Sequence, residues 1–396
     1  MRVLRIPSAL AAVAALMIFA APANAANEIV LGLTNIKSGP IKTPGEGTEI
    51  AVDIAVAEIN AAGGINGKKL RIVKFDTGTD PKQAVVAARK FAQDDGALGI
   101  IGPFSSGEAG AAFPIGERLG IVQIPNASSA PGLTKGKSYA FRLTEDEAKQ
   151  YNRLLTSMKK KGVAARHTEI FYVTDERISK IVGVFLMPKL MKNFGMSTGK
   201  PIGYSYTSFD LAPQATKAMQ SNPDIIAVAS VGMHAGKVLK EMRRQGFKGR
   251  MIGSQLFADP NNIELFGAEA DGTLFASGFW YRLNDETRAF SAKFDVEVKK
   301  RGMKRPFPHH VDAQAYDIVY LFKQAMEKAG VTGDPSKLKA ERTAIRDALN
   351  DIVFSGITGK NVCFDKNGDA ELPGYIIELK GGNWTLFDSH PADPCT

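Results

Sequence analysis

The feature that most constrains the fold is a pair of short, uninterrupted apolar runs at residues 97–101 and 121–124. Runs of this length without polar alternation are typical of strands buried on both faces, as in a parallel sheet. A Gly-Pro pair ends the first run, and a proline ends the second. The stretch between them, 108–119, is long enough for a crossover helix. The sequence therefore predicts a β-loop-α-β unit with parallel strands.

Small hydroxyl residues follow both predicted strands. Ser105 and Ser106 follow the first strand, and Ser128 and Ser129 follow the second. In an open α/β sheet, ligands bind in the loops at the carboxyl ends of the strands. Because Ser106 leads into the predicted helix, hydroxyl and backbone N–H groups there can cradle an anion. The alternative is that these serines are ordinary loop and helix-cap residues, and the pattern favours neither interpretation.

The alternation of strands and helices extends in both directions from this unit. Upstream, predicted strands at 28–35 and 69–75 alternate with predicted helices at 48–62 and 81–95. This order predicts a doubly wound parallel sheet. A second β/α set of similar size begins after Thr144. Two such sets predict two lobes, and the cleft between lobes is the expected place for a small ligand.

The last third of the chain has a different pattern. Three helices are predicted there, at 289–300, 311–329 and 335–349. Three antiparallel strands are predicted after them, at 361–365, 375–379 and 384–387. Within the second β/α set, the predicted helix 178–194 contains Pro188, which predicts a kink or an early stop.

The first 25 residues have the pattern of a secretory signal peptide. They carry two arginines, an apolar core at 10–21 and an Ala-Asn-Ala cleavage motif at 23–25. The core is shorter than the roughly 20 residues that span a bilayer, so it does not predict a membrane anchor. We therefore exclude residues 1–25 from the fold and expect a periplasmic protein.

The two cysteines, Cys363 and Cys395, both lie near the end of the chain. In an exported protein such a pair predicts a disulfide, and the alternative is two unrelated thiols. The formal net charge is +9, but Lys and Arg are mixed with Asp and Glu along the predicted helices. We interpret this surplus as a solubility feature and expect no nucleic-acid partner.

The sequence lacks a recognisable catalytic or cofactor-binding constellation. It has no GxGxxG fingerprint and no P-loop, and the stretch most like a hydrolase elbow, 103–107, has Pro in place of the first Gly. His309-His310 has no Cys or acid at zinc spacing and predicts the start of a helix. We expect no cofactor, no metal and no covalent chemistry. The alternative from another class is a secreted hydrolase that uses Ser105 or Ser106.

Several motifs together resemble those of the leucine/isoleucine/valine-binding proteins, the periplasmic solute receptors of ABC importers. They are SGP at 38–40, AEINAAGGINGKKLRIVKFD at 57–76, DPKQA at 80–84, IIGPFSS at 100–106 and NASSAPGLT at 126–134. The resemblance covers nearly all of residues 28–380. It implies the type I periplasmic binding fold, an α/β fold in which a three-crossover hinge joins two Rossmann-like, doubly wound lobes. The implied lobes are 27–144 plus 277–356 and 145–276 plus 357–396.

The resemblance also implies a ligand site in the loops singled out above. Ser106, Ala127 and Ser129 match the family's serine, main-chain carbonyl and hydroxyl residue. In the family these groups hold the carboxylate of an amino acid and help to hold its ammonium group.

Four positions depart from the family's pattern. Ser179 and Val231 stand where the family has tyrosines, and Pro44 stands where it has an aromatic residue of the first loop. Gln255 stands where the family has the acid that neutralises the ammonium group. Because a buried ammonium group without a counter-charge is costly, we expect a small carboxylate without an α-amino group. Phe104, beside Ser105, can pack against an apolar body. Aromatic acids are therefore the first expectation, and oxo or branched aliphatic acids the next.

A branched-chain or other hydrophobic amino acid is the alternative ligand, because Asp175 or Glu176 can replace the missing acid. The resemblance implies a membrane ABC permease as the partner, and we expect a monomer. A sensory module that serves a receptor instead of a permease is the remaining alternative.

Overall fold

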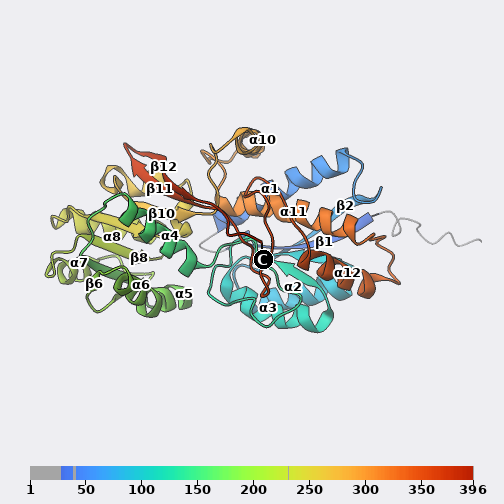
Figure 1. Cartoon of the computed structure of the whole chain (residues 1–396), viewed down its shortest axis with the longest axis horizontal. Coiled ribbons are helices and arrows are strands. Elements are labelled where there is room, and N and C mark those ends of the chain that lie inside the picture. The colour runs from blue at the N-terminus through green and yellow to red at the C-terminus, as the bar shows by residue number, and fades with distance from the viewer. Residues whose placement is uncertain (1–27, 39–41, 231, 396) are drawn as a thin grey trace, which may run out of the picture.

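The computed structural model describes residues 28–38, 42–230 and 232–395. They form two α/β lobes side by side along the long axis of the molecule, each with its own sheet (Figure 1). The predicted α/β class with two lobes is therefore confirmed. The predicted signal peptide, residues 1–25, lies outside the described residues, and so does Val231. In the described part of the chain, no helix combines the length and apolarity needed to cross a membrane.

The sheet of the first lobe is four-stranded and parallel, in the order β2-β1-β3-β4. Its strands are β1 (Glu28–Asn35), β2 (Lys69–Asp76), β3 (Gly99–Ile101) and β4 (Val122–Ile124). β3 pairs with β4 from Gly99 opposite Val122, and every residue of both strands is buried. The two apolar runs thus form parallel strands covered on both faces, as the sequence predicts.

Helices cover both faces of this sheet. They are α1 (Lys42–Ala61), α2 (Pro81–Gln93), α3 (Ser106–Leu119), α10 (Asp285–Lys300), α11 (His310–Lys328) and α12 (Leu338–Asn350). Leu31 and Leu33 of β1 pack with α1 and α11, whereas Val30 packs with α2 and α3, because side chains alternate along a strand. α1 extends back to Lys42 through two glycines. A Cβ at Gly45 would lie 1.9 Å from the Ile36 carbonyl oxygen, so the close approach needs glycine.

The sheet of the second lobe is mixed, in the order β12-β11-β10-β9-β8-β5, with β6 and β7 both paired to β5. Its strands are β5 (His167–Val173), β6 (Ser197–Thr198), β7 (Ile202–Tyr204), β8 (Ile225–Ala229), β9 (Arg250–Gly253), β10 (Leu274–Ser277), β11 (Gly374–Lys380) and β12 (Asn383–His390). The pairs from β5 to β10 are parallel, and the antiparallel hairpin of β11 and β12 forms one edge.

Two of the three predicted antiparallel strands are confirmed by this hairpin. The prediction of a third strand at 361–365 is wrong, because only isolated bridges form there, at Val362 and Phe364. This stretch passes from one lobe to the other and therefore has no continuous partner strand.

The helices of the second lobe are α4 (Glu147–Lys160), α5 (Arg177–Ile181), α6 (Met187–Asn193), α7 (Ala212–Met219), α8 (Gly232–Arg244) and α9 (Asn262–Phe266). A π-helical turn, Val182–Leu186, joins α5 to α6, so the helix does not stop at Pro188. The N–H of Met187 reaches back to the carbonyl of Val182. This wider turn precedes Pro188, which lacks an N–H, and lets the helix continue past it.

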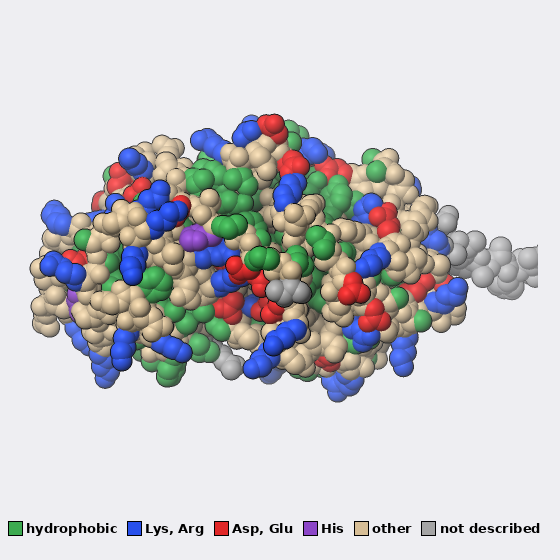
Figure 2. Space-filling model, in the orientation of Figure 1, with side chains coloured by type: hydrophobic (Ala, Val, Ile, Leu, Met, Phe, Trp, Pro, Cys, Tyr) green, Lys and Arg blue, Asp and Glu red, His purple; other side chains and the backbone are tan. Residues whose placement is uncertain are grey.

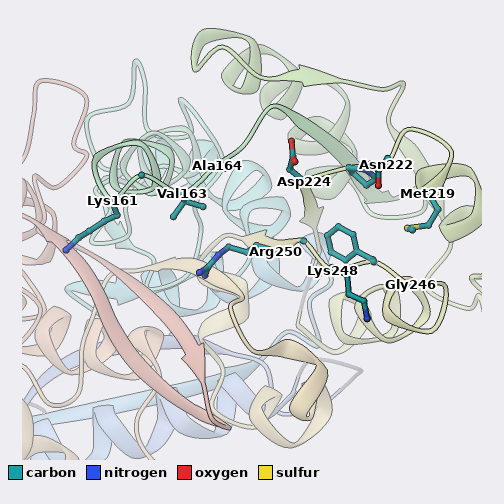
Figure 3. Close-up of a pocket in the computed structure, with 13 residues that line it drawn as sticks. Lys161, Val163, Ala164, Met219, Asn222, Asp224, Gly246, Lys248 and Arg250 are labelled. Carbon is teal, nitrogen blue, oxygen red and sulfur yellow. The ribbon is translucent and has the colours of Figure 1, made fainter.

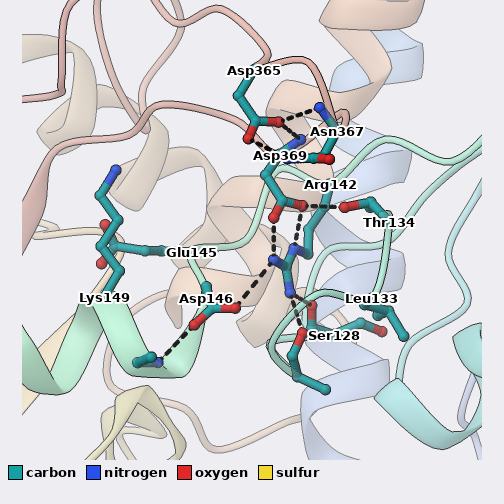
Figure 4. Close-up of polar contacts among 12 residues, drawn as sticks. Ser128, Leu133, Thr134, Arg142, Glu145, Asp146, Lys149, Asp365, Asn367 and Asp369 are labelled. Atoms are coloured by element: carbon teal, nitrogen blue, oxygen red, sulfur yellow. Dashed lines mark hydrogen bonds and ion pairs between the residues drawn. The ribbon is translucent and has the colours of Figure 1, made fainter. Parts of the chain in front are cut away.

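The chain passes between the two sheets three times, after β4, after β10 and after α12. A fully buried arginine links the first and third passages (Figure 4). Arg142 forms a bidentate pair with Asp369, at 2.9 and 2.6 Å. The same guanidinium donates to the carbonyls of Ser128 and Ala130, at 3.3 and 2.7 Å. One side chain therefore holds both passages and the loop after β4.

The predicted disulfide between Cys363 and Cys395 is present, with Cα atoms 5.8 Å apart. It attaches residue 395 to the third passage. Lys149 of α4 pairs with Asp393 at 2.6 Å and with Glu371 at 2.5 Å, beside the same passage. The last residues of the described chain are thus fixed beside the junction of the two lobes.

Candidate ligand-binding site

A cavity of about 350 Å³ opens where β3 and β4 of the first lobe end, and residues of both lobes line it. Of the residues predicted from the sequence, it brings together Phe104, Ser105, Ser106, Ala127, Ser129 and Ser179. Position at the carboxyl ends of parallel strands is the usual place for a ligand in such sheets.

The loop after β3 contributes both of its serines to this cavity. The Ser105 hydroxyl accepts a hydrogen bond from the N–H of Glu108 at 3.3 Å, and the Glu108 carboxylate accepts one from the N–H of Ser105 at 2.9 Å. Ser105 is thus the N-cap of α3 in a capping box, as the alternative interpretation of the serines proposed. The Ser106 hydroxyl accepts from the N–H of Ala130 at 3.1 Å and so ties the two loops together.

The two serines of the loop after β4 point in different directions. Ser128 turns away from the cavity and donates to the Phe104 carbonyl at 3.0 Å. Ser129 lines the cavity and donates to the Glu147 carboxyl at 3.2 Å. Because Arg142 holds the carbonyls of Ser128 and Ala130, the backbone on each side of Ser129 is fixed.

Glu147, at the start of α4, is a site residue that the sequence patterns did not indicate. Only 2% of its surface is exposed, and burial raises the pKa of its carboxyl to about 7, although the Ser129 hydroxyl opposes the shift. Glu176 also lines the cavity, but its carboxylate accepts from the N–H groups of Ile178 and Ser179 at the start of α5. Among the described lining residues there is no Lys or Arg, so a ligand anion would meet only neutral donors.

The histidine pair lies in the wall of the same cavity, at the start of α11. The prediction that it begins a helix is confirmed. Burial lowers the pKa values of His309 and His310 well below the usual range, so both rings are neutral. The described residues contain no cluster of three or more metal-ligating side chains.

The remaining predicted residues lie around this cavity in different ways. Ser179 lines it, but its hydroxyl donates to the Ala229 carbonyl and accepts from the N–H of Val173 at 2.6 Å. Gln255 does not line it, although its neighbours Ser254 and Leu256 do. The Gln255 side chain is buried, with neither amide atom hydrogen-bonded.

A larger hollow of about 620 Å³ lies elsewhere on the second lobe (Figure 3). Its lining includes Lys161, Asp224 and Arg250, which lie at or just before the amino ends of β5, β8 and β9. Ligands of such sheets bind at the opposite ends of the strands, so this hollow is not the candidate site. On the face shown in Figure 2, basic and acidic side chains are interspersed over both lobes, which fits our interpretation of the net charge.

A family model described as periplasmic binding protein matches residues 28–383, nearly the whole of the described chain. The chain belongs to the periplasmic binding protein family. This periplasmic binding protein is 26% identical over 363 residues to the Leu/Ile/Val-binding protein homolog 1 of Brucella suis, covering 88% of this chain and 90% of that one. It is 30% identical over 254 residues to the Leu/Ile/Val-binding protein of Escherichia coli K12, covering 63% and 67% of the two chains. The resemblance drawn from the sequence motifs is confirmed.

Solved structures show the same fold at low identity. A branched-chain amino acid transporter substrate binding protein from Streptococcus pneumoniae, in complex with isoleucine, matches with a TM-score of 0.79 at 22% identity, covering 93% of this chain and 100% of that one. An ABC transporter solute binding protein from R. palustris, in complex with benzoate, matches with a TM-score of 0.78 at 20% identity, covering 93% and 98%. The periplasmic binding protein described here therefore has the predicted type I fold, shared by proteins with different ligands.

Proposed function

We propose that this protein binds a small carboxylate with an apolar body in the cavity between its lobes and delivers it to an ABC permease. An aromatic or oxo acid is the favoured ligand. The observation that carries the proposal is that Ser106 and Ser129 both line the cavity where α3, a helix of 14 residues, begins. Hydroxyls and N–H groups at a helix N-terminus bind anions without a cationic side chain. Phe104 and Val311 supply an apolar wall beside them.

The protonation of Glu147 decides whether an anion is tolerated beside Ser129. A carboxyl with a pKa raised to about 7 is protonated in a large fraction of molecules near neutral pH, and a protonated carboxyl can donate to a ligand carboxylate. The ionised form would instead repel it. The cavity therefore accepts an anion together with a proton on Glu147.

A hydrophobic amino acid is the second candidate, and the position of Glu147 is the observation that favours it. The carboxyl contacts the Ser129 hydroxyl, at a position that the resemblance assigns to ammonium binding. In its ionised form, Glu147 would supply the counter-charge that Gln255 lacks. A hydrolase has less support, because Ser105 is engaged as a helix cap and Ser106 accepts from the N–H of Ala130.

The proposal also includes export with removal of residues 1–25, a monomeric state and no covalent chemistry. Relatives described as transporter substrate binding proteins support the permease as partner more than a sensory receptor. No cofactor is proposed.

A thermal-shift screen of the mature protein tests the ligand class. Benzoate or a branched oxo acid at about 100 times its Kd should stabilise the folded state by about 2.7 kcal/mol. Ser129→Ala should weaken that binding, because it removes a lining hydroxyl that holds the Glu147 carboxyl in place. Stabilisation by leucine, with none by any aromatic or oxo acid, would contradict the favoured ligand class and support the amino acid.

The pH dependence of binding separates the two candidates. Since anion binding requires protonated Glu147, affinity for benzoate should rise as pH falls from about 8 to about 6, by up to tenfold per pH unit above the pKa. Affinity for an amino acid held by ionised Glu147 should fall over the same interval. Titration calorimetry at several pH values measures both trends. Glu147→Gln is the matched variant, and a slope that persists in it would show that another group titrates.

A further inference from the structure

Neutral polar groups of the cavity wall lack hydrogen-bond partners. Nδ1 of His310 and both ring nitrogens of His309 are buried and form no well-aligned hydrogen bond with a described residue, although the His309 ring lies close to the backbone of Gln255. The two residues are 4% and 2% exposed, and both line the cavity. Buried polar atoms are nearly always paired, and leaving one unpaired costs about 1–3 kcal/mol. Because both residues line the cavity, their unpaired nitrogens favour a ligand that brings a polar group to this wall.

The charged residues around His309 and His310 determine which charge the polar group of the ligand can carry. Arg305 is buried and paired with Asp312 at 2.7 Å, so its charge is already neutralised. It also donates to the carbonyl of Thr43 at 3.0 Å. Asp259 is a further lining residue of the cavity and disfavours a second anion. Because both imidazoles are neutral, each can donate through one nitrogen and accept through the other.

We propose that the ligand carries a neutral hydroxyl or oxo group in addition to its carboxylate, and that His309 and His310 hydrogen-bond to this group. The inference rests on the proposed function, since it assumes that a carboxylate occupies the serine loops. An unsubstituted hydrocarbon body would leave the ring nitrogens unpaired. A second carboxylate would meet Asp259 without a free cation.

Matched ligands test this inference on the mature protein. We expect 4-hydroxybenzoate or another hydroxylated benzoate to bind at least about tenfold more tightly than benzoate, because sites built to pair a hydroxyl reject analogues that lack it. A methylbenzoate of similar size is the control for shape. Equal affinity for hydroxylated, methylated and unsubstituted acids would overturn the inference and leave the proposed function intact. If no carboxylate binds at all, the proposed function fails and the inference fails with it.

Variants of the pair separate hydrogen bonding from packing. His309→Phe and His310→Phe should abolish or reduce the preference for the hydroxylated ligand while benzoate still binds, and benzoate binding shows that each variant is folded. His309→Gln should retain part of the preference, because an amide both donates and accepts. His390→Phe, outside the cavity, should leave the preference unchanged. A preference that survives unreduced in both phenylalanine variants would show that water or another wall satisfies the ligand.

Discussion

Arg142→Ala is expected to lower the free energy of unfolding by about 3 kcal/mol, because it removes a fully buried guanidinium that pairs with the partly exposed Asp369 and donates to two backbone carbonyls. The substitution would free the Asp369 carboxylate, which also accepts from the Thr134 hydroxyl at 2.7 Å. It would also leave the carbonyls of Ser128 and Ala130 without their donor. Denaturant unfolding followed by circular dichroism measures the change.

The same variant should bind ligand more weakly even where it is fully folded. Arg142 fixes the backbone on both sides of Ser129, so its loss frees the loop that presents the cavity's donors. We expect the Kd to rise by at least about tenfold, which corresponds to about 1.4 kcal/mol of lost binding free energy. Arg142→Lys keeps the charge but not the planar fork, and should recover part of the affinity. An unchanged Kd in folded Arg142→Ala protein would show that Arg142 has only a structural role.

Lys149→Ala is the matched control for this experiment. Lys149 also links α4 to the third passage, through Glu371, and pairs with Asp393 after β12, but it contacts neither ligand loop. Its side chain is 30% exposed, and exposed pairs contribute about 0–1 kcal/mol. We expect little change in stability and no change in Kd.

Removal of the disulfide should lower the free energy of unfolding by about 3–4 kcal/mol, because the unfolded chain regains the entropy that a bridge between residues 32 apart removes. The double variant Cys363→Ala with Cys395→Ala should therefore unfold at a lower denaturant concentration than the oxidised protein. Reduction of the wild-type protein should produce a similar shift. Ligand affinity should remain, because neither cysteine lines the cavity. Coincident unfolding curves for oxidised and reduced protein would contradict the prediction.

The parallel sheet of the first lobe was predictable because its central strands are unbroken apolar runs. Such short runs are typical of strands that are covered on both faces. The positions of the loops that carry Ser106 and Ser129 were also predictable, because the carboxyl ends of parallel strands lie at the same edge of a sheet. The prediction of a strand at 361–365 was wrong because the local pattern is that of a strand, but no continuous partner strand lies beside it. The prediction of a kink or an early stop at Pro188 assumed an α-helical turn before the proline. The wider π-helical turn there lets the helix continue past it.

The charges of the site were not predictable from the sequence. Glu147 follows Ser129 by 18 residues and begins a helix in the other lobe, so only the path of the first passage brings the two together. The acid expected by resemblance at position 255 is replaced by a glutamine outside the lining. His309-His310 was correctly interpreted as a helix start, but a helix start does not reveal that its first turn borders a cavity.

Arg142 contacts both the loop that presents Ser129 and two of the passages between the lobes. We therefore expect ligand affinity and the angle between the lobes to depend on each other. Free-energy coupling between two events is reciprocal, so a side chain that links loop geometry to the interlobe passages couples them in both directions. If an occupied cavity favours one angle between the lobes, a permease that imposes another angle lowers the affinity by the same factor. Under the proposed function, a permease could then release the ligand by changing the angle between the lobes, without a competing ligand.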